Sequence, residues 1–270
     1  MLEKIQETTD YIKKIIKTNP KTGIILGTGL GNLVTQLTDT LEIPYERIPN
    51  FPVSTVEGHS GKLIFGKLGN VDVMAMQGRF HYYEGYNMKE VTFPVRVMRA
   101  LGIENLLVSN ASGGMHPDFE IGDLMIITDH INLFPEHPLR GKNYKELGTR
   151  FPDMSEAYSK ELIAKAKAIA KRNNIRVVEG VYIGTTGPTF ETPAEYKYFH
   201  IIGGDAVGMS TVPEVIVANH AGMRVFGISI ITDLGVQGKI VEVTHEEVQE
   251  IGNRAQPLMT QIMKELVKEI

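Results

Sequence analysis

The sequence predicts an α/β fold, a single domain with a central mixed β-sheet flanked by helices. Short Val- and Ile-rich runs alternate along the chain with segments of helical periodicity. Several of these runs are apolar throughout, which is typical of strands covered on both faces. Two strand-like runs are separated only by Gly69-Asn70, a turn dipeptide that predicts an antiparallel hairpin. The sheet is therefore expected to be mixed and not purely parallel.

The predicted elements alternate along the whole chain. Strands are expected at 22–27, 62–76 with the hairpin turn inside it, 104–110, 123–129, 176–184 and 223–233. Helices are expected at 88–101, 155–173, 193–201, 211–221 and 244–268, and residues 32–39 also look helical. The N-terminal segment spaces Leu and Ile at roughly helical period among charges, which indicates an amphipathic surface helix. Residues 130–153 show no clear periodicity, and loops of that length are usually functional or mobile.

Composition narrows the possible functions. The chain has 270 residues, no long polar linker and no internal repeat, so residues 1–270 are expected to form one domain. It has no cysteine, which excludes disulfides and thiolate metal sites and favours a reduced cytoplasmic setting. A formal net charge of −4 disfavours nucleic acid as a partner, and no segment resembles a secretory signal or a membrane span. The eight histidines show no metal-ligand spacing, so no metal is expected.

Polar clusters follow the predicted strands. In α/β folds, ligands bind where strands end and loops begin, so these clusters are expected to converge on one site. They are GTGLG (27–31), VEGHSG (56–61), QGRFHYYEG (77–85), SNASGG (109–114), TGPTFET (186–192) and ITDLG (231–235).

The first three clusters carry groups that bind oxyanions. Arg79 offers a planar fork of donors that matches phosphate, Thr28 adds a hydroxyl in a glycine-rich loop, and His59 and His81 add further donors. Each residue alone is explained as well by a tight turn or an exposed hairpin loop. The glycines do not form a dinucleotide-binding fingerprint, and no Walker lysine follows them. Together, the four residues favour phosphate binding.

Phe190 and Glu191 allow two interpretations. An aromatic ring beside a carboxylate can stack on a heterocycle and accept its N–H groups. Alternatively, Thr192 and Glu195 simply cap the helix that starts at Pro193. In the same way, residues 208–214 can be a helix start capped by Ser210 or Thr211.

The motifs resemble those of a known family. GTGLG, EGHSG, QGRFHYYEG, SNASGGM, DHINL, RFPDMSEAY, GPTFETPAE, DAVGMSTVPEVIVA and THEEV occur in order over nearly the whole chain. They are similar to those of the trimeric, low-molecular-mass purine nucleoside phosphorylases. The resemblance implies a distorted mixed sheet of the nucleoside phosphorylase type, a homotrimer, and reversible attack of phosphate on purine (2'-deoxy)ribonucleosides. Phosphate would be a co-substrate, and no cofactor is implied.

The resemblance also implies roles for individual residues. Phosphate would be bound by Thr28, His59, Arg79, His81, the backbone of Ala111, and Ser210. The ribose would contact Tyr83, Met209 and His245, with Phe151 reaching in from the neighbouring subunit. The base would contact Phe190, Glu191, Val207 and Asp233. Catalysis would depend chiefly on His81, Glu191 and Asp233.

Asp233 departs from the family pattern, which has asparagine at this position. An ionised aspartate only accepts hydrogen bonds, so it would clash with O6 and N7 of a 6-oxopurine, whereas it can accept from the 6-amino group of adenine. Related phosphorylases that act on 6-aminopurines have aspartate here. Glu191 indicates the opposite preference, because it suits the N1–H of hypoxanthine or guanine.

We therefore expect 6-oxopurine nucleosides as the main substrates, with Asp233 protonated when they bind. The alternatives are an Asp233 that turns outward, an adenosine or methylthioadenosine phosphorylase, a hydrolytic nucleosidase, and a non-catalytic nucleoside or phosphate binding protein.

Overall fold

The computed structural model describes residues 1–27, 30–53 and 61–270. In this part of the chain the strands form one mixed sheet in the order β2-β3-β4-β1-β5-β8-β7-β6-β9, and β9 also pairs with β5. The five strands β5, β8, β7, β6 and β9 thus close into a ring, while β1, β4, β3 and β2 extend from it as an open sheet. This closure distorts the sheet and places strands that are distant in sequence next to one another.

The strands are β1 (Thr22–Leu26), β2 (Leu37–Pro44), β3 (Lys62–Leu68), β4 (Val71–Gln77), β5 (Asn105–Gly114), β6 (Leu124–Asn132), β7 (Val177–Gly184), β8 (Ala206–Gly208) and β9 (Arg224–Leu234). The α-helices are α1 (Leu2–Ile15), α2 (Met88–Val91), α3 (Phe93–Ala100), α4 (Lys160–Arg172), α5 (Pro193–Ile201), α6 (Val212–His220) and α7 (His245–Lys268). Short 3₁₀ helices lie at Gly31–Gln36, Tyr45–Arg47, Tyr82–Glu84 and Lys145–Leu147. The α/β class, the mixed sheet and the hairpin between β3 and β4 confirm the sequence prediction.

Two local predictions were wrong, and one strand was not predicted. Residues 32–39 do not form one helix: the 3₁₀ turn stops at Gln36 and β2 starts at Leu37, on the outer edge of the sheet, where its side chains are mostly exposed and give no apolar run. The three-residue strand β8 was not predicted because it is too short to show a period. The helix expected at 88–101 is two helices that meet at Thr92, just before Phe93 and Pro94.

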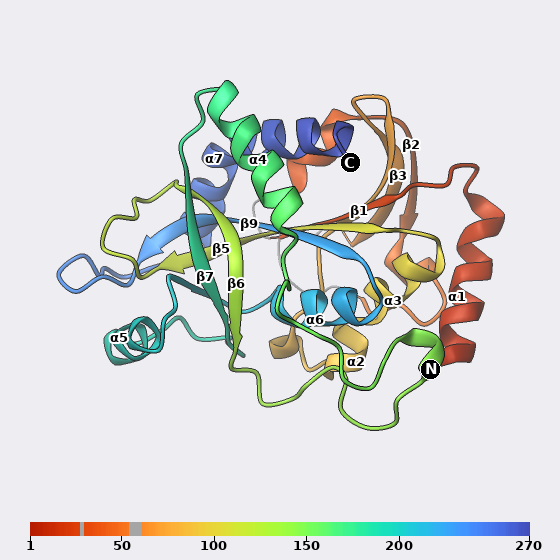
Figure 1. Ribbon diagram of the computed structural model, residues 1–270, viewed down its shortest axis with the longest axis horizontal. Helices are drawn as coiled ribbons and strands as arrows, with labels where there is room; N and C mark the ends of the chain where they lie inside the picture. Colours follow the sequence, from red (N-terminus) through yellow and green to blue (C-terminus); the bar gives the residue numbers. More distant parts are fainter. Residues whose placement is uncertain (28–29, 54–60) are drawn as a thin grey trace.

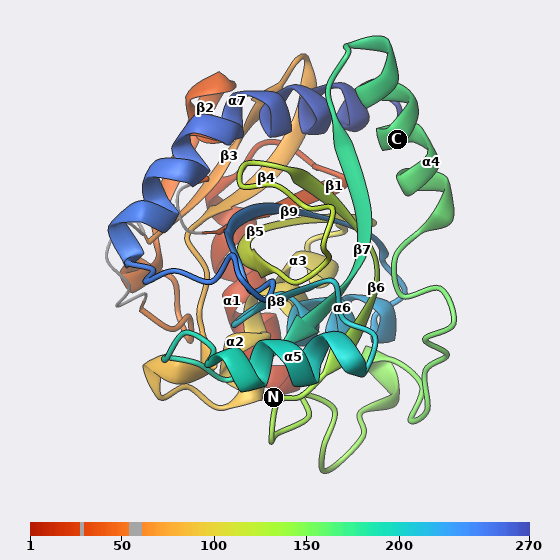
Figure 2. The ribbon, with the colours of Figure 1, turned by 90° about the vertical axis from the view of Figure 1, so that its left-hand side faces the viewer.

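Helices cover both faces of the sheet (Figure 1). α4 and α7 lie together on one side, and α1, α3 and α6 lie on the other. Apart from the edge strand β2, the strands are largely buried, and most of the apolar interior forms one continuous core. The view turned by 90° shows that α5 lies apart from both layers, below the short strand β8 (Figure 2). None of the described helices is long and apolar enough to cross a membrane.

One irregularity in the sheet directs a side chain toward the site. β5 and β9 run parallel with Ser112 opposite Ile231, but the next pair is Gly113 opposite Asp233. Thr232 is therefore the extra residue of a β-bulge. A bulge shifts the alternation of side chains by one position, so Asp233 occupies a place that regular pairing would give to Thr232.

Candidate active site

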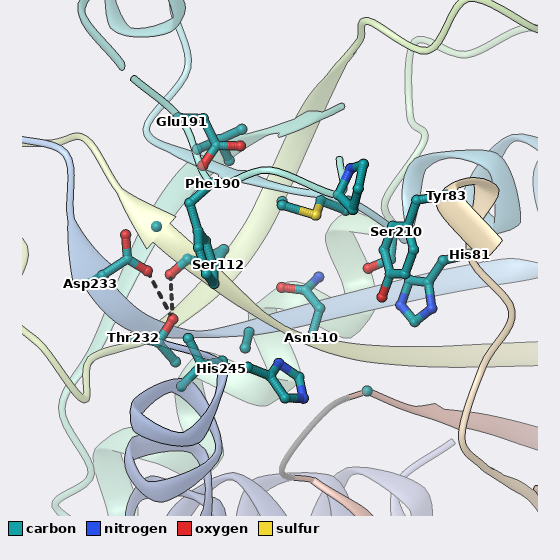
Figure 3. Close-up of a pocket in the computed structure, with 18 of the residues that line it drawn as sticks. His81, Tyr83, Asn110, Ser112, Phe190, Glu191, Ser210, Thr232, Asp233 and His245 are labelled. Carbon is teal, nitrogen blue, oxygen red and sulfur yellow. Dashed lines mark hydrogen bonds between the residues drawn. The ribbon is translucent and has the colours of Figure 1, made fainter. Parts of the chain in front are cut away.

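A cavity of about 660 Å³ lies where β5, β8 and β9 meet the loop after β4, the segment before α5 and the start of α7. Figure 3 shows the side chains around it, with Phe190, Glu191 and Asp233 at one end and His81, Tyr83 and Ser210 at the other. The predicted residues that line it are Arg79, His81, Tyr83, Ala111, Phe190, Glu191, Val207, Met209, Ser210, Asp233 and His245. The fold therefore brings six separate sequence segments to one cavity.

Arg79 is fixed at one wall of the cavity. Its side chain is 1% exposed, and its Nε and Nη2 donate to the two carboxylate oxygens of Glu214 at 3.1 and 2.7 Å. Nη1 donates to the carbonyl oxygen of Ser109 at 2.6 Å. A guanidinium held by a bidentate carboxylate and a carbonyl keeps one orientation. The sequence prediction omitted Glu214, although it is the one acid in the otherwise apolar first turns of α6.

His81 is oriented by its neighbours in QGRFHYYEG. Its Nδ1 lies 3.1 Å from Glu84 Oε1, which also accepts from the His81 backbone N–H at 2.7 Å. Its ring stacks on Tyr83, with 4.7 Å between ring centroids and 14° between planes. Burial lowers the pKa of His81, so the ring is neutral at pH 7, and with the proton on Nδ1 its Nε2 is the basic atom. Glu84 is a second contributor that the sequence prediction did not include.

Ser210 precedes a strained turn. Thr211 has φ 68° and ψ −55°, and the N–H of Val212 donates to the carbonyl of Ser210 at 2.7 Å, which together define a γ-turn of the rare positive-φ type. The hydroxyl of Thr211 accepts from Asn110 Nδ2 at 2.9 Å and lies 3.1 Å from Ser210 Oγ. Thr211 does occupy the N-cap position of α6, but its side chain makes no capping hydrogen bond. Such strain in a β-branched residue is typical of functional sites.

The other end of the cavity carries two carboxylates, Glu191 and Asp233. Asp233 is 6% exposed and does not turn outward; its Oδ2 accepts from Tyr196 Oη at 2.7 Å and its Oδ1 from Thr232 Oγ1 at 3.1 Å. Burial raises the pKa of Asp233 and raises the pKa of Glu191 to about 7. Glu191 is therefore partly protonated near neutral pH.

The capping interpretation of this segment is also confirmed. Thr192 and Glu195 form a reciprocal capping box at the start of α5, with Glu195 N–H donating to Thr192 Oγ1 at 3.2 Å and Thr192 N–H donating to Glu195 Oε2 at 2.7 Å. The box fixes the start of the helix, and the two residues before it, Phe190 and Glu191, remain on the cavity wall.

The described cavity accounts for all but three of the predicted residues. Thr28 and His59 lie outside the described residues. Phe151 is 85% exposed and borders a different hollow, together with Arg150 and Met154. Among the described residues, no group of three or more His, Asp or Glu side chains is arranged to hold a metal ion.

Comparison with known proteins identifies the family. The model of the phosphorylase superfamily matches residues 21–268. The chain is 52% identical over 269 residues to purine nucleoside phosphorylase 1 of Bacillus subtilis, covering 100% of this chain and 99% of that protein. The chain belongs to the purine nucleoside phosphorylases.

Two solved structures of a purine nucleoside phosphorylase from Schistosoma support this assignment. One, from Schistosoma mansoni, is a complex with adenosine and superimposes with a TM-score of 0.95 at 41% identity, covering 100% of this chain and 98% of that one. The other is a complex with hypoxanthine and has a TM-score of 0.94, also at 41% identity and with the same coverage. The sequence prediction of a purine nucleoside phosphorylase is confirmed, and with it the enzymatic interpretation over the binding-protein alternative.

The geometry suits phosphorolysis by a purine nucleoside phosphorylase. Phosphate is both the nucleophile and a counter-ion to the oxocarbenium-like sugar, so the protein needs no nucleophile of its own. What it must supply is an anion-binding wall, a sugar-binding surface and a group that stabilises the leaving base, held in fixed relative positions. The cavity offers a buried cation at Arg79, a stacked histidine and tyrosine beside it, and two carboxylates at the far end.

Proposed function

We propose that this enzyme chiefly cleaves 6-oxopurine nucleosides, inosine and guanosine and their 2'-deoxy forms, to the free base and (deoxy)ribose 1-phosphate in purine salvage. The observation that carries the proposal is the position of Glu191, a carboxylate beside the ring of Phe190 on the cavity wall. An ionised Glu191 accepts from the N1–H of hypoxanthine or guanine, a proton that adenine lacks.

The phosphate-binding residues in the described part of the proposed site are Arg79, His81, the backbone of Ala111, and Ser210, with Thr28 and His59 completing the set. Arg79 is the residue that supplies a fixed positive charge, while Ser210 and neutral His81 supply hydrogen bonds. The ribose contacts Tyr83, Met209 and His245. As the bond between the anomeric carbon and the purine nitrogen breaks, a phosphate oxygen bonds to that carbon and the base leaves with the bonding electrons, to be stabilised by a proton at N7.

Asp233 is proposed to hold a proton when a 6-oxopurine binds, and to donate it toward N7 or O6 as an asparagine would. Its burial supports this role, because a low-dielectric setting disfavours the carboxylate. Phe190 stacks on the base, and Val207 lines the pocket beside it.

A second candidate activity is cleavage of adenosine. Asp233 favours it, because an ionised aspartate accepts from the 6-amino group, and the Schistosoma mansoni relative was crystallised with adenosine. A methylthioadenosine phosphorylase has less support, since His245 on the cavity wall suits a free 5'-hydroxyl better than an apolar methylthio group.

The test is release of base from inosine, guanosine, adenosine and methylthioadenosine, each with and without phosphate. We expect phosphate-dependent cleavage with the highest kcat/KM for inosine and guanosine. Release without phosphate would indicate a nucleosidase, and a higher kcat/KM for either adenine nucleoside would contradict the proposed base preference.

We further propose a cytoplasmic homotrimer in which Phe151 covers the sugar bound by the neighbouring subunit. An aromatic side chain that is 85% exposed and absent from the cavity of its own chain supports this role. Light scattering is expected to give three times the 30.0 kDa chain mass.

Trimers assembled from two different variants test whether Phe151 contributes to the site of the neighbouring subunit. Phe151→Ala is expected to lower kcat/KM for inosine at least tenfold, since the sugar loses an apolar cover and becomes accessible to water. Mixed trimers with Glu191→Gln chains, which keep Phe151, are expected to recover activity beyond the sum of the two pure variants. Simple additivity in the mixed trimers would contradict a contribution across the subunit boundary.

A further inference from the structure

Tyr196 stands behind the base end of the site without lining the cavity. It lies on α5, it is 3% exposed, and its hydroxyl donates to Asp233 Oδ2 at 2.7 Å. Two glycines make room for its ring: a Cβ at Gly113 would lie 3.0 Å from the Tyr196 hydroxyl, and a Cβ at Gly235 would overlap the ring itself. The surrounding backbone thus accommodates a tyrosine whose hydroxyl points at the carboxylate of Asp233.

The other hydroxyl beside Asp233 is shared. Thr232 Oγ1 lies 3.1 Å from Asp233 Oδ1 and 3.3 Å from the carbonyl oxygen of Ser112, as the dashed lines in Figure 3 show. A hydroxyl has one proton, so Thr232 donates to only one of these acceptors at a time. The hydroxyl of Tyr196 donates to Asp233 Oδ2 at 2.7 Å, and it also interacts, more weakly, with the carboxylate of Glu191. Asp233 is therefore the main acceptor of the Tyr196 proton.

Few charged groups surround Asp233. Glu191 lies on the same cavity wall, Glu195 follows it on α5, and His245 faces the cavity from α7. The neighbouring strands β5 and β8 carry no ionisable side chain. Among the described residues, no lysine or arginine lines the cavity near the two carboxylates; Arg79, the cation that these residues place on its wall, belongs to the phosphate end and is paired with Glu214. Burial raises the pKa of both carboxylates, so hydrogen bonds to one or the other contribute to which of them holds a proton.

The two positions of that proton correspond to two classes of base. With the proton on Asp233, Glu191 accepts from N1–H and Asp233 donates, which matches a 6-oxopurine. With the proton on Glu191, Glu191 donates to N1 and Asp233 accepts from the 6-amino group, which matches adenine. The number of protons is the same in both arrangements, so one cavity can recognise both bases.

We propose that Tyr196 is a specificity-determining residue: by donating to Asp233 it stabilises the arrangement with the proton on Glu191, and so admits adenosine as a second substrate beside the 6-oxopurine nucleosides. This inference rests on the proposed function of the cavity, with Glu191 and Asp233 facing the base. Tyr196 acts through Asp233 and is a positioning residue.

The experiment compares kcat/KM for inosine and adenosine in wild type and Tyr196→Phe. Without the phenol donor, ionised Asp233 loses a charge-assisted hydrogen bond, so adenosine is expected to lose about tenfold in kcat/KM relative to inosine. The matched control is Tyr198→Phe, the same change on the same helix at a side chain that is 53% exposed, and it is expected to leave the ratio unchanged. An unchanged ratio in Tyr196→Phe would overturn the inference.

A double-mutant cycle separates positioning from packing. Asp233→Asn donates from a fixed amide whatever the hydroxyl of Tyr196 does, so adding Tyr196→Phe to it is expected to change the inosine-to-adenosine ratio less than twofold. The pH dependence of the ratio adds a second criterion: both arrangements in wild type hold one proton, so the ratio is expected to change little with pH, whereas Asp233→Asn is expected to gain inosine preference as the pH rises and Glu191 ionises. A tenfold effect of Tyr196→Phe that persists in Asp233→Asn would indicate packing and contradict the inference.

Failure of the inference and failure of the proposed function give different results. If wild type releases no base from inosine in the presence of phosphate, the proposed function is wrong. If it cleaves inosine but not adenosine, the function stands and the role of Tyr196 is wrong.

Discussion

Arg79→Met is expected to lower kcat/KM for phosphorolysis of inosine by about 10²–10³, the usual effect of removing a group that stabilises charge in a transition state. Arg79 is the cation on the wall of the described cavity, and its orientation is set by Glu214 and by the carbonyl of Ser109. The same change is expected to destabilise the fold by about 3–5 kcal/mol, because Glu214, whose side chain is 4% exposed, becomes a buried carboxylate without its partner. Urea unfolding and steady-state kinetics measure the two effects.

The double variant Arg79→Met, Glu214→Gln separates stability from catalysis. A neutral pair removes the unpaired buried charge, so most of the lost stability is expected to return. Activity is expected to remain low, since the phosphate still lacks its cation. If activity returned together with stability, Arg79 would be a structural residue, and the phosphate would have to be bound by other groups.

The sequence predicted most of the site because its residues lie in short motifs at strand ends. QGRFHYYEG and ITDLG place their polar groups where β4 and β9 stop, and the parallel arrangement of β4, β1, β5 and β9 brings those ends together. TGPTFET follows β7, which is connected to β5 through the short strand β8. The class of fold followed from the same alternation of strands and helices. Where the role of a residue depends only on its own segment, the local sequence was sufficient to predict that role.

The residues that the prediction omitted act through tertiary contacts. Glu214 is 135 positions from Arg79, and Tyr196 is 37 from Asp233. Neither stands in a motif with its partner, and the bulge that moves Asp233 into the site depends on the register between β5 and β9. In physical terms, the sequence shows which groups are available near a strand end, whereas their orientation is decided by packing that no single segment encodes.

Glu191→Gln is expected to reverse the order of substrates. The amide of glutamine donates to N1 of adenine as protonated Glu191 would, but it replaces the charged acceptor that N1–H of hypoxanthine needs. Loss of a hydrogen bond to a charged group corresponds to about 10- to 100-fold in kcat/KM, so inosine is expected to fall by that factor while adenosine changes little. Equal losses for both nucleosides would contradict a direct contact between Glu191 and the base.

The same variant is expected to change two pH dependences. Burial raises the pKa of Glu191 from 4.5 to about 7, so in the free wild-type enzyme kcat/KM for inosine should rise with pH through about 7, and Glu191→Gln should remove that limb. In the unfolded chain the carboxyl ionises near its ordinary pKa, so between about pH 4.5 and 7 the unfolded state binds fewer protons than the folded state. The contribution of Glu191 to wild-type stability should therefore be greatest below that window and fall by up to about 3 kcal/mol as the pH rises through it. Denaturant unfolding of the wild type and of Glu191→Gln at pH 5 and pH 8 measures this difference in stability. An equal pH dependence of stability in the two proteins would assign it to another ionisable group.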